Sequence, residues 1–214
     1  LSTIMNREFH RWYSPSLGRD MDLLVFGHAG ARAVVFPTSM GRFFEWEDRG
    51  MIAALAEPIE RGWLQLFCVD SVDEDSWYAK WKRPSDRAHR HAQFDAYVRD
   101  EVLPLSTQRN PHAFLSTMGA SFGAYHAVSF ALRYPNLVSR AIGLSGMYDI
   151  RQQTDGYSDA TVYHYNPADF ILGAPVSFGT PGPEIRGRVA AWRDGFFVLD
   201  KWQATRKLSL NYGL

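Results

Sequence analysis

Short, largely apolar runs alternate with helical segments along most of this chain, and this alternation limits the folds open to it. Residues 63–69 and 113–118 are runs of the kind that form strands buried on both faces of a sheet. Between them lies an apolar stripe at helical spacing, formed by Phe94, Tyr97, Val98, Val102 and Leu105. Strands that alternate with helices in this way predict an α/β fold, a mostly parallel sheet with helices on both faces.

The other expected elements are marked by their ends. Residues 21–26 and 33–36 are apolar and are separated by the glycine-containing residues 27–30, so we expect them to form an antiparallel hairpin at the N-terminal edge of the sheet. Further expected elements are an extended segment at 8–13, a helix over 46–57 ended by Pro58, a helix capped by Ser85 and Asp86, a helix over 121–134 ended by Pro135, and a strand at 141–145.

Composition and charge limit the classes of function that this chain can have. The chain has 214 residues, of which 46% are hydrophobic, and its 23 basic residues equal its 23 acidic ones. This balance lacks the basic footprint of a nucleic-acid or membrane-surface partner, and no apolar run approaches the roughly 20 residues needed to cross a bilayer. The single cysteine, Cys68, lies in an apolar run, which predicts a buried free thiol and a cytoplasmic protein.

The strongest chemical signal is the motif Gly-Ala-Ser-Phe-Gly at residues 119–123, between an expected strand and an expected helix. In a G-x-S-x-G nucleophile elbow, a sharp turn lifts the serine hydroxyl above the sheet edge, and the glycines allow close packing. The motif predicts Ser121 as a nucleophile, with Gly119 and Gly123 as its elbow glycines. A serine that only caps a helix beside packing glycines is the alternative.

A nucleophilic serine also needs hydrogen-bond donors for the negative charge that develops on the carbonyl oxygen, the oxyanion hole. The turn predicts the backbone N–H of Phe122 as one donor. The second is expected in the loop at residues 36–42, where we place it at Met40, with Ser39 as the neighbouring candidate. An ordinary strand-to-helix loop is the alternative for this segment.

The segments 12–20, 36–42, 68–73 and 119–126 resemble the esterase family of α/β-hydrolases that includes S-formylglutathione hydrolases, mycolyltransferases and siderophore esterases. The resemblance runs from about Met5 to Phe170. It implies that Ser121 is the nucleophile and that Met40 and Phe122 are the oxyanion donors. It also implies an acyl-enzyme route to the hydrolysis of small carboxylic esters or thioesters, without a cofactor.

The chain departs from this family where the rest of the catalytic triad belongs. In the fold, an acid and then a histidine follow the serine, yet only His126 and His164 follow Ser121. His126 lies five residues into the expected helix, and we expect it to be packed there. A triad of Ser121, Asp149 and His164 is one alternative, although no further expected strand lies between Ser145 and His164 to carry the acid. Asp200, at the end of the apolar run 196–199, is the other candidate acid.

The family resemblance stops after Phe170. Residues 173–183 are rich in glycine and proline, no histidine follows, and the chain begins without a methionine. We therefore expect a hydrolase core at 1–172 and an atypical tail at 173–214, derived from a reading-frame shift or a truncated gene. The predicted function is a serine esterase whose activity is impaired. A non-catalytic binding protein with the same fold is the alternative.

Three weaker signals favour structure over chemistry. The acidic residues Asp70, Asp73, Glu74 and Asp75 predict a solvated loop more than a cation site. His89 and His91 are two apart on a helix and do not share a face, so no metal site is predicted. Several aromatic residues follow strand ends and either wall an acyl pocket or belong to the core, namely Phe43, Phe44, Trp46, Trp77, Tyr78 and Trp81.

Overall fold

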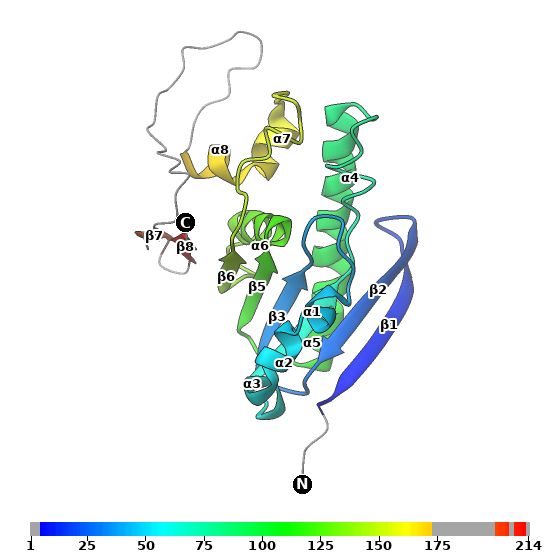
Figure 1. The fold of residues 1–214 in the computed structure, drawn as a ribbon, viewed down its shortest axis with the longest axis vertical. Helices are drawn as coiled ribbons and strands as arrows, with labels where there is room; N and C mark the ends of the chain where they lie inside the picture. The colour runs from blue at the N-terminus through cyan, green and yellow to red at the C-terminus, as the bar shows by residue number, and fades with distance from the viewer. Residues whose placement is uncertain (1–4, 173–199, 206–207, 213–214) are drawn as a thin grey trace.

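The computed structural model describes residues 5–172, 200–205 and 208–212, and its centre is a six-stranded sheet with the order β1-β2-β4-β3-β5-β6 (Figure 1). Strands β3, β4, β5 and β6 are parallel, while β2 runs antiparallel to β4, and β1 to β2. The carboxyl ends of four strands therefore meet at one edge. The strands are β1 (Arg7–Ser14), β2 (Arg19–Phe26), β3 (Ala31–Phe36), β4 (Leu64–Val69), β5 (Leu115–Ala120) and β6 (Arg140–Leu144).

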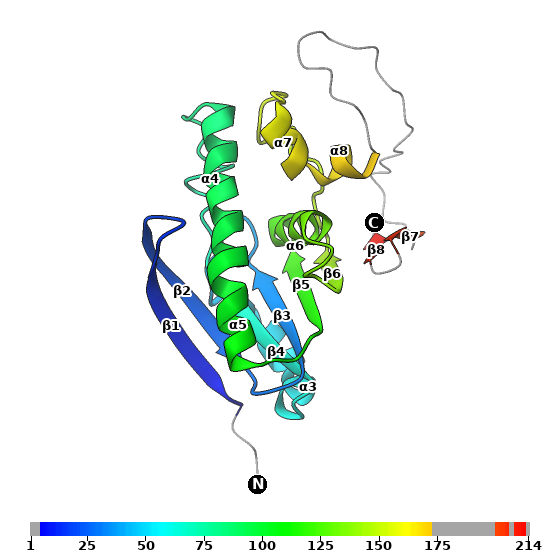
Figure 2. The ribbon, with the colours of Figure 1, turned by 180° about the vertical axis from the view of Figure 1, so that it is seen from behind.

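Helices cover both faces of this sheet, as the alternation predicts. Figure 1 shows the short α1, α2 and α3 in front of one face, and Figure 2 shows α4 and α5 in front of the other. The helices are α1 (Glu45–Asp48), α2 (Met51–Ala54), α3 (Ala56–Glu60), α4 (Pro84–Tyr97), the π-helical turn η1 (Val98–Val102), α5 (Leu103–Arg109), α6 (Phe122–Arg133), α7 (Ala160–Tyr165) and α8 (Pro167–Leu172). None of the helices described is both long and apolar enough to span a membrane.

The apolar strands divide their side chains between two cores. In β4, Phe67 packs with the α4 and α6 side, whereas Leu66 and Cys68 pack with the α1 to α3 side. The stripe predicted for the long helix lies against the first core, where four of its five residues are buried and Leu105 is partly buried. The thiol of Cys68 is free and buried as predicted, and burial raises its pKa.

The predicted N-terminal hairpin exists, but it is formed by different strands. β2 pairs with β1, and β4 lies between β2 and β3, so the hairpin predicted across residues 27–30 is wrong. The reason lies in two glycines with positive φ, Gly27 and Gly30, which let this segment pass close to the backbone that enters β4. A Cβ at Gly30 would lie 2.2 Å from the carbonyl carbon of Trp63.

Helix boundaries also differ from those predicted. The helix expected over 46–57 is broken into α1, α2 and α3, with Gly50 at a φ of 75° before α2. Pro58 lies in the first turn of α3 instead of ending a helix, because a residue there needs no N–H donor. Ser85 and Asp86 lie inside α4, which begins at Pro84, and the N-cap residue, Arg83, makes no side-chain capping bond.

Near the C-terminus, β7 (Asp200–Thr205) and β8 (Leu208–Tyr212) form a separate antiparallel pair. Asp200 therefore begins a strand, paired with Tyr212, and does not end one as predicted. The apolar residues 196–199 lie outside the described residues. Most of the predicted tail lies there too, so the division at residue 172 stays a prediction.

The close approach at Gly30 can be tested by comparing it with Gly50, since both have positive φ. A Cβ at Gly50 meets nothing within 4 Å. We expect Gly50→Ala to lower the free energy of unfolding by about 1–2 kcal/mol, the cost of the left-handed conformation. Gly30→Ala should cost about 1–3 kcal/mol more, because its methyl group meets backbone. Equal losses in urea unfolding would contradict the packing described for β4.

Candidate active site

Ser121 occupies the turn between β5 and α6, at the edge where the parallel strands end. It has a φ of 54° and a ψ of −118°, and its residue is exposed. Its backbone N–H donates to the carbonyl oxygen of Leu144, the last residue of β6, at 2.9 Å. The backbone thus has the strained strand-to-helix geometry that the motif predicts, with a strain of about 1–3 kcal/mol for a residue other than glycine.

The glycines on either side of Ser121 fill positions that no side chain can enter. A Cβ at Gly119 would lie 2.1 Å from the carbonyl oxygen of Gly123, and a Cβ at Gly123 would lie 2.4 Å from that of Phe36. The start of α6 therefore rests on the end of β3, whose Phe36 also pairs with Gly119 across the sheet. Phe122 begins α6, so its N–H is one of the donors that have no partner within the helix.

The loop after β3 does not present its donors as the sequence predicts. The N–H of Met40 donates to Oδ2 of Asp73 at 3.0 Å, and only 1% of Asp73 is exposed. This N–H therefore points into the protein and is already engaged, which corrects the assignment of Met40 as the second oxyanion donor. Ser39, the neighbouring candidate, remains, and its hydroxyl accepts a hydrogen bond from the hydroxyl of Tyr78 at 2.7 Å.

Asp73 is the residue that the sequence interpretation missed. Its Oδ1 lies 2.8 Å from Nε2 of His126, and both side chains are almost completely buried. The imidazole of His126 stacks on Phe36 at 5.7 Å and meets the edge of Phe122 at 5.0 Å, so His126 is packed under the Ser121 turn as predicted. One carboxylate thus joins the loop after β3, the loop after β4 and helix α6.

The acidic loop after β4 is not the solvated loop that its composition predicts. Asp70 is only 3% exposed and is held by the guanidinium of Arg42, at 2.7 Å. Burial raises the pKa of Asp70. Glu74 is the exposed member of the group. The position of these acids in the sequence could have indicated their burial. Acidic residues directly after a buried strand lie at the edge of the sheet, where the N–H groups of loops need acceptors.

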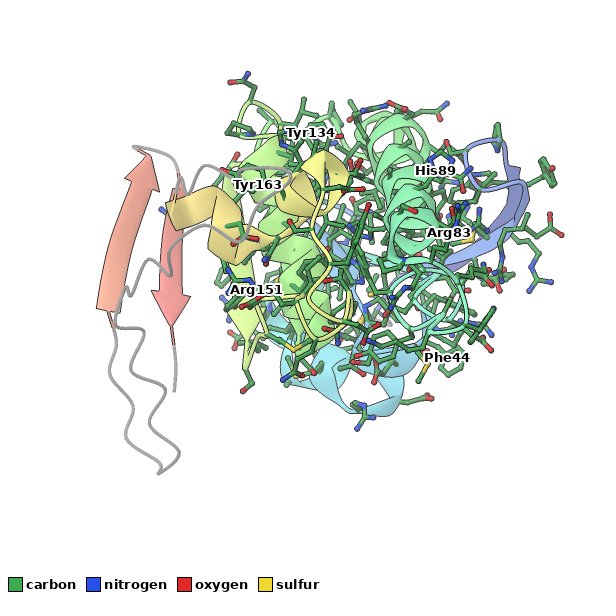
Figure 3. The ribbon with its side chains drawn as sticks, turned by 90° about the horizontal axis from the view of Figure 1, so that it is seen from above. Phe44, Arg83, His89, Tyr134, Arg151 and Tyr163 are labelled. Atoms are coloured by element: carbon green, nitrogen blue, oxygen red, sulfur yellow. The ribbon has the colours of Figure 1, made fainter. Side chains whose placement is uncertain are left out.

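His91 and His89 lie on different sides of α4, as predicted. His91 is buried beside His126, with 5.3 Å between their ring centroids, whereas His89 is exposed (Figure 3). Burial, together with the nearby His126 and Arg133, holds the pKa of His91 well below its ordinary value. In the part of the chain that the structure describes, no group of three or more metal-ligating side chains is assembled.

The structure does not assemble the predicted acid and histidine. Oδ1 of Asp149 accepts from the N–H of Arg151 at 3.0 Å and from Asn166 at 3.3 Å. His164 is exposed on α7, where its ring contacts that of Tyr163. Figure 3 labels Tyr163 on this helix. All seven histidines lie within the described residues 5–172, and none of them makes a described hydrogen bond with Ser121. The side chain of Asp200 lies outside the described part of the structure.

The aromatic residues expected near the site divide between core and surface. Trp46 and Trp77 are buried in the core, while 74% of Trp81 is exposed. Phe43 and Phe44 pack edge to face with each other, and the guanidinium of Arg42 lies over both rings. Tyr78 is the member tied to the Ser121 turn, because its ring meets that of Phe122 edge-on at 5.3 Å.

The Asp73 contacts predict a large effect on stability. Asp73→Ala should lower the free energy of unfolding by about 2–6 kcal/mol, since it leaves the buried Nε2 of His126 and the N–H of Met40 without a hydrogen-bond partner, at about 1–3 kcal/mol each. Asp73→Asn should cost less, because one oxygen remains. The control is Glu74→Ala, on the exposed neighbour, which should change stability by less than about 0.5 kcal/mol. Similar losses for the two alanine variants would contradict the buried position of Asp73.

His91 predicts a dependence of stability on pH. Its lowered pKa means that below about pH 6.5 the unfolded chain binds a proton that the folded chain does not. The free energy of unfolding should therefore fall as the pH drops below 6.5, by up to about 1.4 kcal/mol per pH unit from this group. His91→Phe should reduce this slope between pH 6.5 and 5, and His89→Gln should not. An unchanged slope in His91→Phe would show that His91 is protonated in the fold.

Several solved structures with the same architecture are esterases or other hydrolases. An S-formylglutathione hydrolase from Agrobacterium tumefaciens superposes with a TM-score of 0.64 and 15% identity, over 79% of this chain and 71% of that one. A ferulic acid esterase superposes with a TM-score of 0.61 and 11% identity, over 80% of this chain and 72% of that one. A fluorophosphonate-binding serine hydrolase from Staphylococcus aureus superposes with a TM-score of 0.56 and 15% identity, over 79% of this chain and 73% of that one. No curated protein sequence matches the chain significantly.

A family model described as an outer membrane beta barrel domain matches residues 105–214. The described part of that stretch consists of residues 105–172, 200–205 and 208–212. Within 105–172 the parallel strands β5 and β6 are joined by the buried helix α6, whereas β7 and β8 form an antiparallel pair. Neighbouring strands of a membrane barrel are antiparallel, so this match does not describe the architecture found over 105–172. The strand order, the parallel register and the solved neighbours together establish that the chain has the α/β-hydrolase fold.

Proposed function

We propose that this chain is a serine hydrolase in which Ser121 attacks carboxylic esters or thioesters and forms an acyl-enzyme. The observation that carries the proposal is the placement of Ser121, exposed and at positive φ between β5 and α6. Backbone strain of this kind persists where the position of a side chain matters for function. The hydrolases among the structural neighbours support the same reaction class.

The chemistry begins when Oγ of Ser121 forms a bond with the carbonyl carbon. The π electrons of the carbonyl move to its oxygen, which becomes an oxyanion. The N–H of Phe122 and the positive end of the α6 dipole are suited to stabilise that charge. When the electron pair returns, the bond from carbon to the leaving oxygen or sulfur breaks, that atom takes a proton from solvent to give the alcohol or thiol, and the acyl group stays on Ser121. Water then releases the acid by the same two steps.

The proton of Ser121 has no histidine acceptor at the site, and we infer that activity is impaired for this reason. His126 is held by Asp73 in the core, and His164 has its ring contact with Tyr163. The serine proton must then pass to solvent. Loss of a triad histidine costs about 10⁶ in turnover, while the oxyanion donors and substrate binding still leave roughly 10³–10⁴ over water. Asp149, His164 and Asp200 remain only as weak candidates for the missing roles.

Covalent labelling of the full chain by a fluorophosphonate probe tests the proposal. We expect slow labelling at a single site, with peptide mass spectrometry locating the adduct on Ser121. Ser121→Ala should abolish labelling, and Ser85→Ala, a serine in the first turn of α4, should leave it unchanged. Hydrolysis of activated aryl esters should be only slightly faster than the uncatalysed reaction, for the reason given by the missing histidine.

Two outcomes would overturn parts of this proposal. If the parent chain is labelled no more than Ser121→Ala, the chain is a non-catalytic protein that keeps the fold for binding. If turnover is fast and is abolished by both Ser121→Ala and His164→Gln, the nucleophile stands but the activity is not impaired, because His164 reaches the serine during the reaction.

A further inference from the structure

The loop after β3 has few donors left for a substrate. Thr38 donates both its N–H and its hydroxyl to the carboxylate of Glu45, at 2.7 and 2.6 Å. The N–H of Gly41 donates to the carbonyl oxygen of Thr38 at 2.9 Å, and that of Met40 donates to Asp73. Across residues 38–41 as the structure describes them, Ser39 alone keeps donors with no acceptor, its N–H and its hydroxyl proton.

The hydroxyl of Ser39 is prepared to donate. Its oxygen accepts the hydroxyl proton of Tyr78 at 2.7 Å, so its own proton is free to rotate toward another acceptor. A hydroxyl that accepts one hydrogen bond is polarised and donates a second one more strongly. Neither Ser39 nor Tyr78 is fully buried, so a ligand can reach this pair.

The pair is attached to both segments that meet at Ser121. Ser39 belongs to the loop that follows Phe36, and the start of α6 rests on Phe36 through Gly123. The ring of Tyr78 meets Phe122, the residue whose N–H is the first proposed donor, edge-on at 5.3 Å. Asp73 completes the arrangement, because it draws the Met40 N–H inward and accepts the N–H of Tyr78 through its carbonyl oxygen at 3.0 Å.

We propose that the hydroxyl of Ser39, polarised by Tyr78, is the second hydrogen-bond donor to the carbonyl oxygen of the substrate. This inference rests on the proposed function of Ser121. As the bond from Ser121 to carbon forms, the Ser39 hydroxyl and the Phe122 N–H donate to the oxygen that gains the electron pair. No proton is transferred to that oxygen, and both hydrogen bonds weaken when the pair returns and the leaving group departs.

The rate constant for phosphonylation of Ser121 by a fluorophosphonate probe, in the full chain, measures this interaction. The P=O oxygen gains negative charge in that reaction as a carbonyl oxygen does in acylation. Ser39→Ala keeps the backbone N–H and removes only the hydroxyl, and it should slow labelling by about 10²–10³-fold. Ser39→Thr keeps a hydroxyl and should recover most of the rate. Tyr78→Phe should slow labelling by about fivefold, the effect of one neutral hydrogen bond.

Matched controls separate this role from a structural one. Ser85→Ala and Tyr157→Phe remove hydroxyls elsewhere, on α4 and on the exposed Tyr157, and should label at the parental rate. Thermal unfolding midpoints of all variants report whether each one folds. If Ser39→Ala does not fold, the labelling rates of Tyr78→Phe and Tyr157→Phe are compared instead, and a slower rate in Tyr78→Phe alone supports the polarised pair.

The outcomes distinguish this inference from the proposed function. If the parent chain is labelled at Ser121 and folded Ser39→Ala reacts at the parental rate, the Ser39 hydroxyl is not a donor and the role of Ser121 stands. A parental rate for Tyr78→Phe would likewise overturn the polarised pair. If the parent chain is not labelled at Ser121, the proposed function fails and this inference fails with it.

Discussion

The close approach of α6 to the end of β3 is the constraint on which the candidate site depends. Two glycines permit it, since a side chain at Gly119 or Gly123 would overlap backbone atoms. The parallel register that pairs Phe36 with Gly119 fixes the height at which the two strands end. The residues that follow, the loop at 37–42 and the turn at Ser121, are therefore neighbours whatever their side chains. The chemistry is set by which donors this backbone leaves unengaged.

Buried carboxylates determine which backbone donors near Ser121 stay free. Glu45 takes the donors of Thr38, Asp73 takes the N–H of Met40, and Asp70 holds Arg42. Glu45 and Asp73 satisfy loop N–H groups that would otherwise be left without partners at the sheet edge, where an unsatisfied buried group costs about 1–3 kcal/mol. The same contacts fix the loop and remove its N–H groups from the site. The loop can therefore offer a substrate only those hydrogen-bond donors that the carboxylates do not already accept from.

The sequence predicts the parts of this structure that depend on local pattern. The short apolar runs of the strands, the stripe on the long helix and the Gly-x-Ser-x-Gly turn each predict the element they belong to, because each signal lies within a short stretch of sequence. The strands of the hairpin were assigned wrongly because a glycine turn looks the same whether its strands pair or admit another strand between them. The inward N–H of Met40 could not be predicted, since its acceptor lies 33 residues away on the loop after β4.

The distribution of positive φ angles separates the two edges of the sheet. At the edge where the parallel strands begin, the positions with positive φ are Gly27, Gly30 and Gly62, which carry no steric penalty. At the edge where the parallel strands end, positive φ occurs at Gly18, in the β1–β2 turn, and also at Met40, Ser121 and Ser145, where a side chain makes it costly. Glycine would relieve the strain at each of these three positions, yet the chain has side chains there. In the described residues, backbone strain of this kind lies at the edge that holds Ser121, which is where the proposed function would require it.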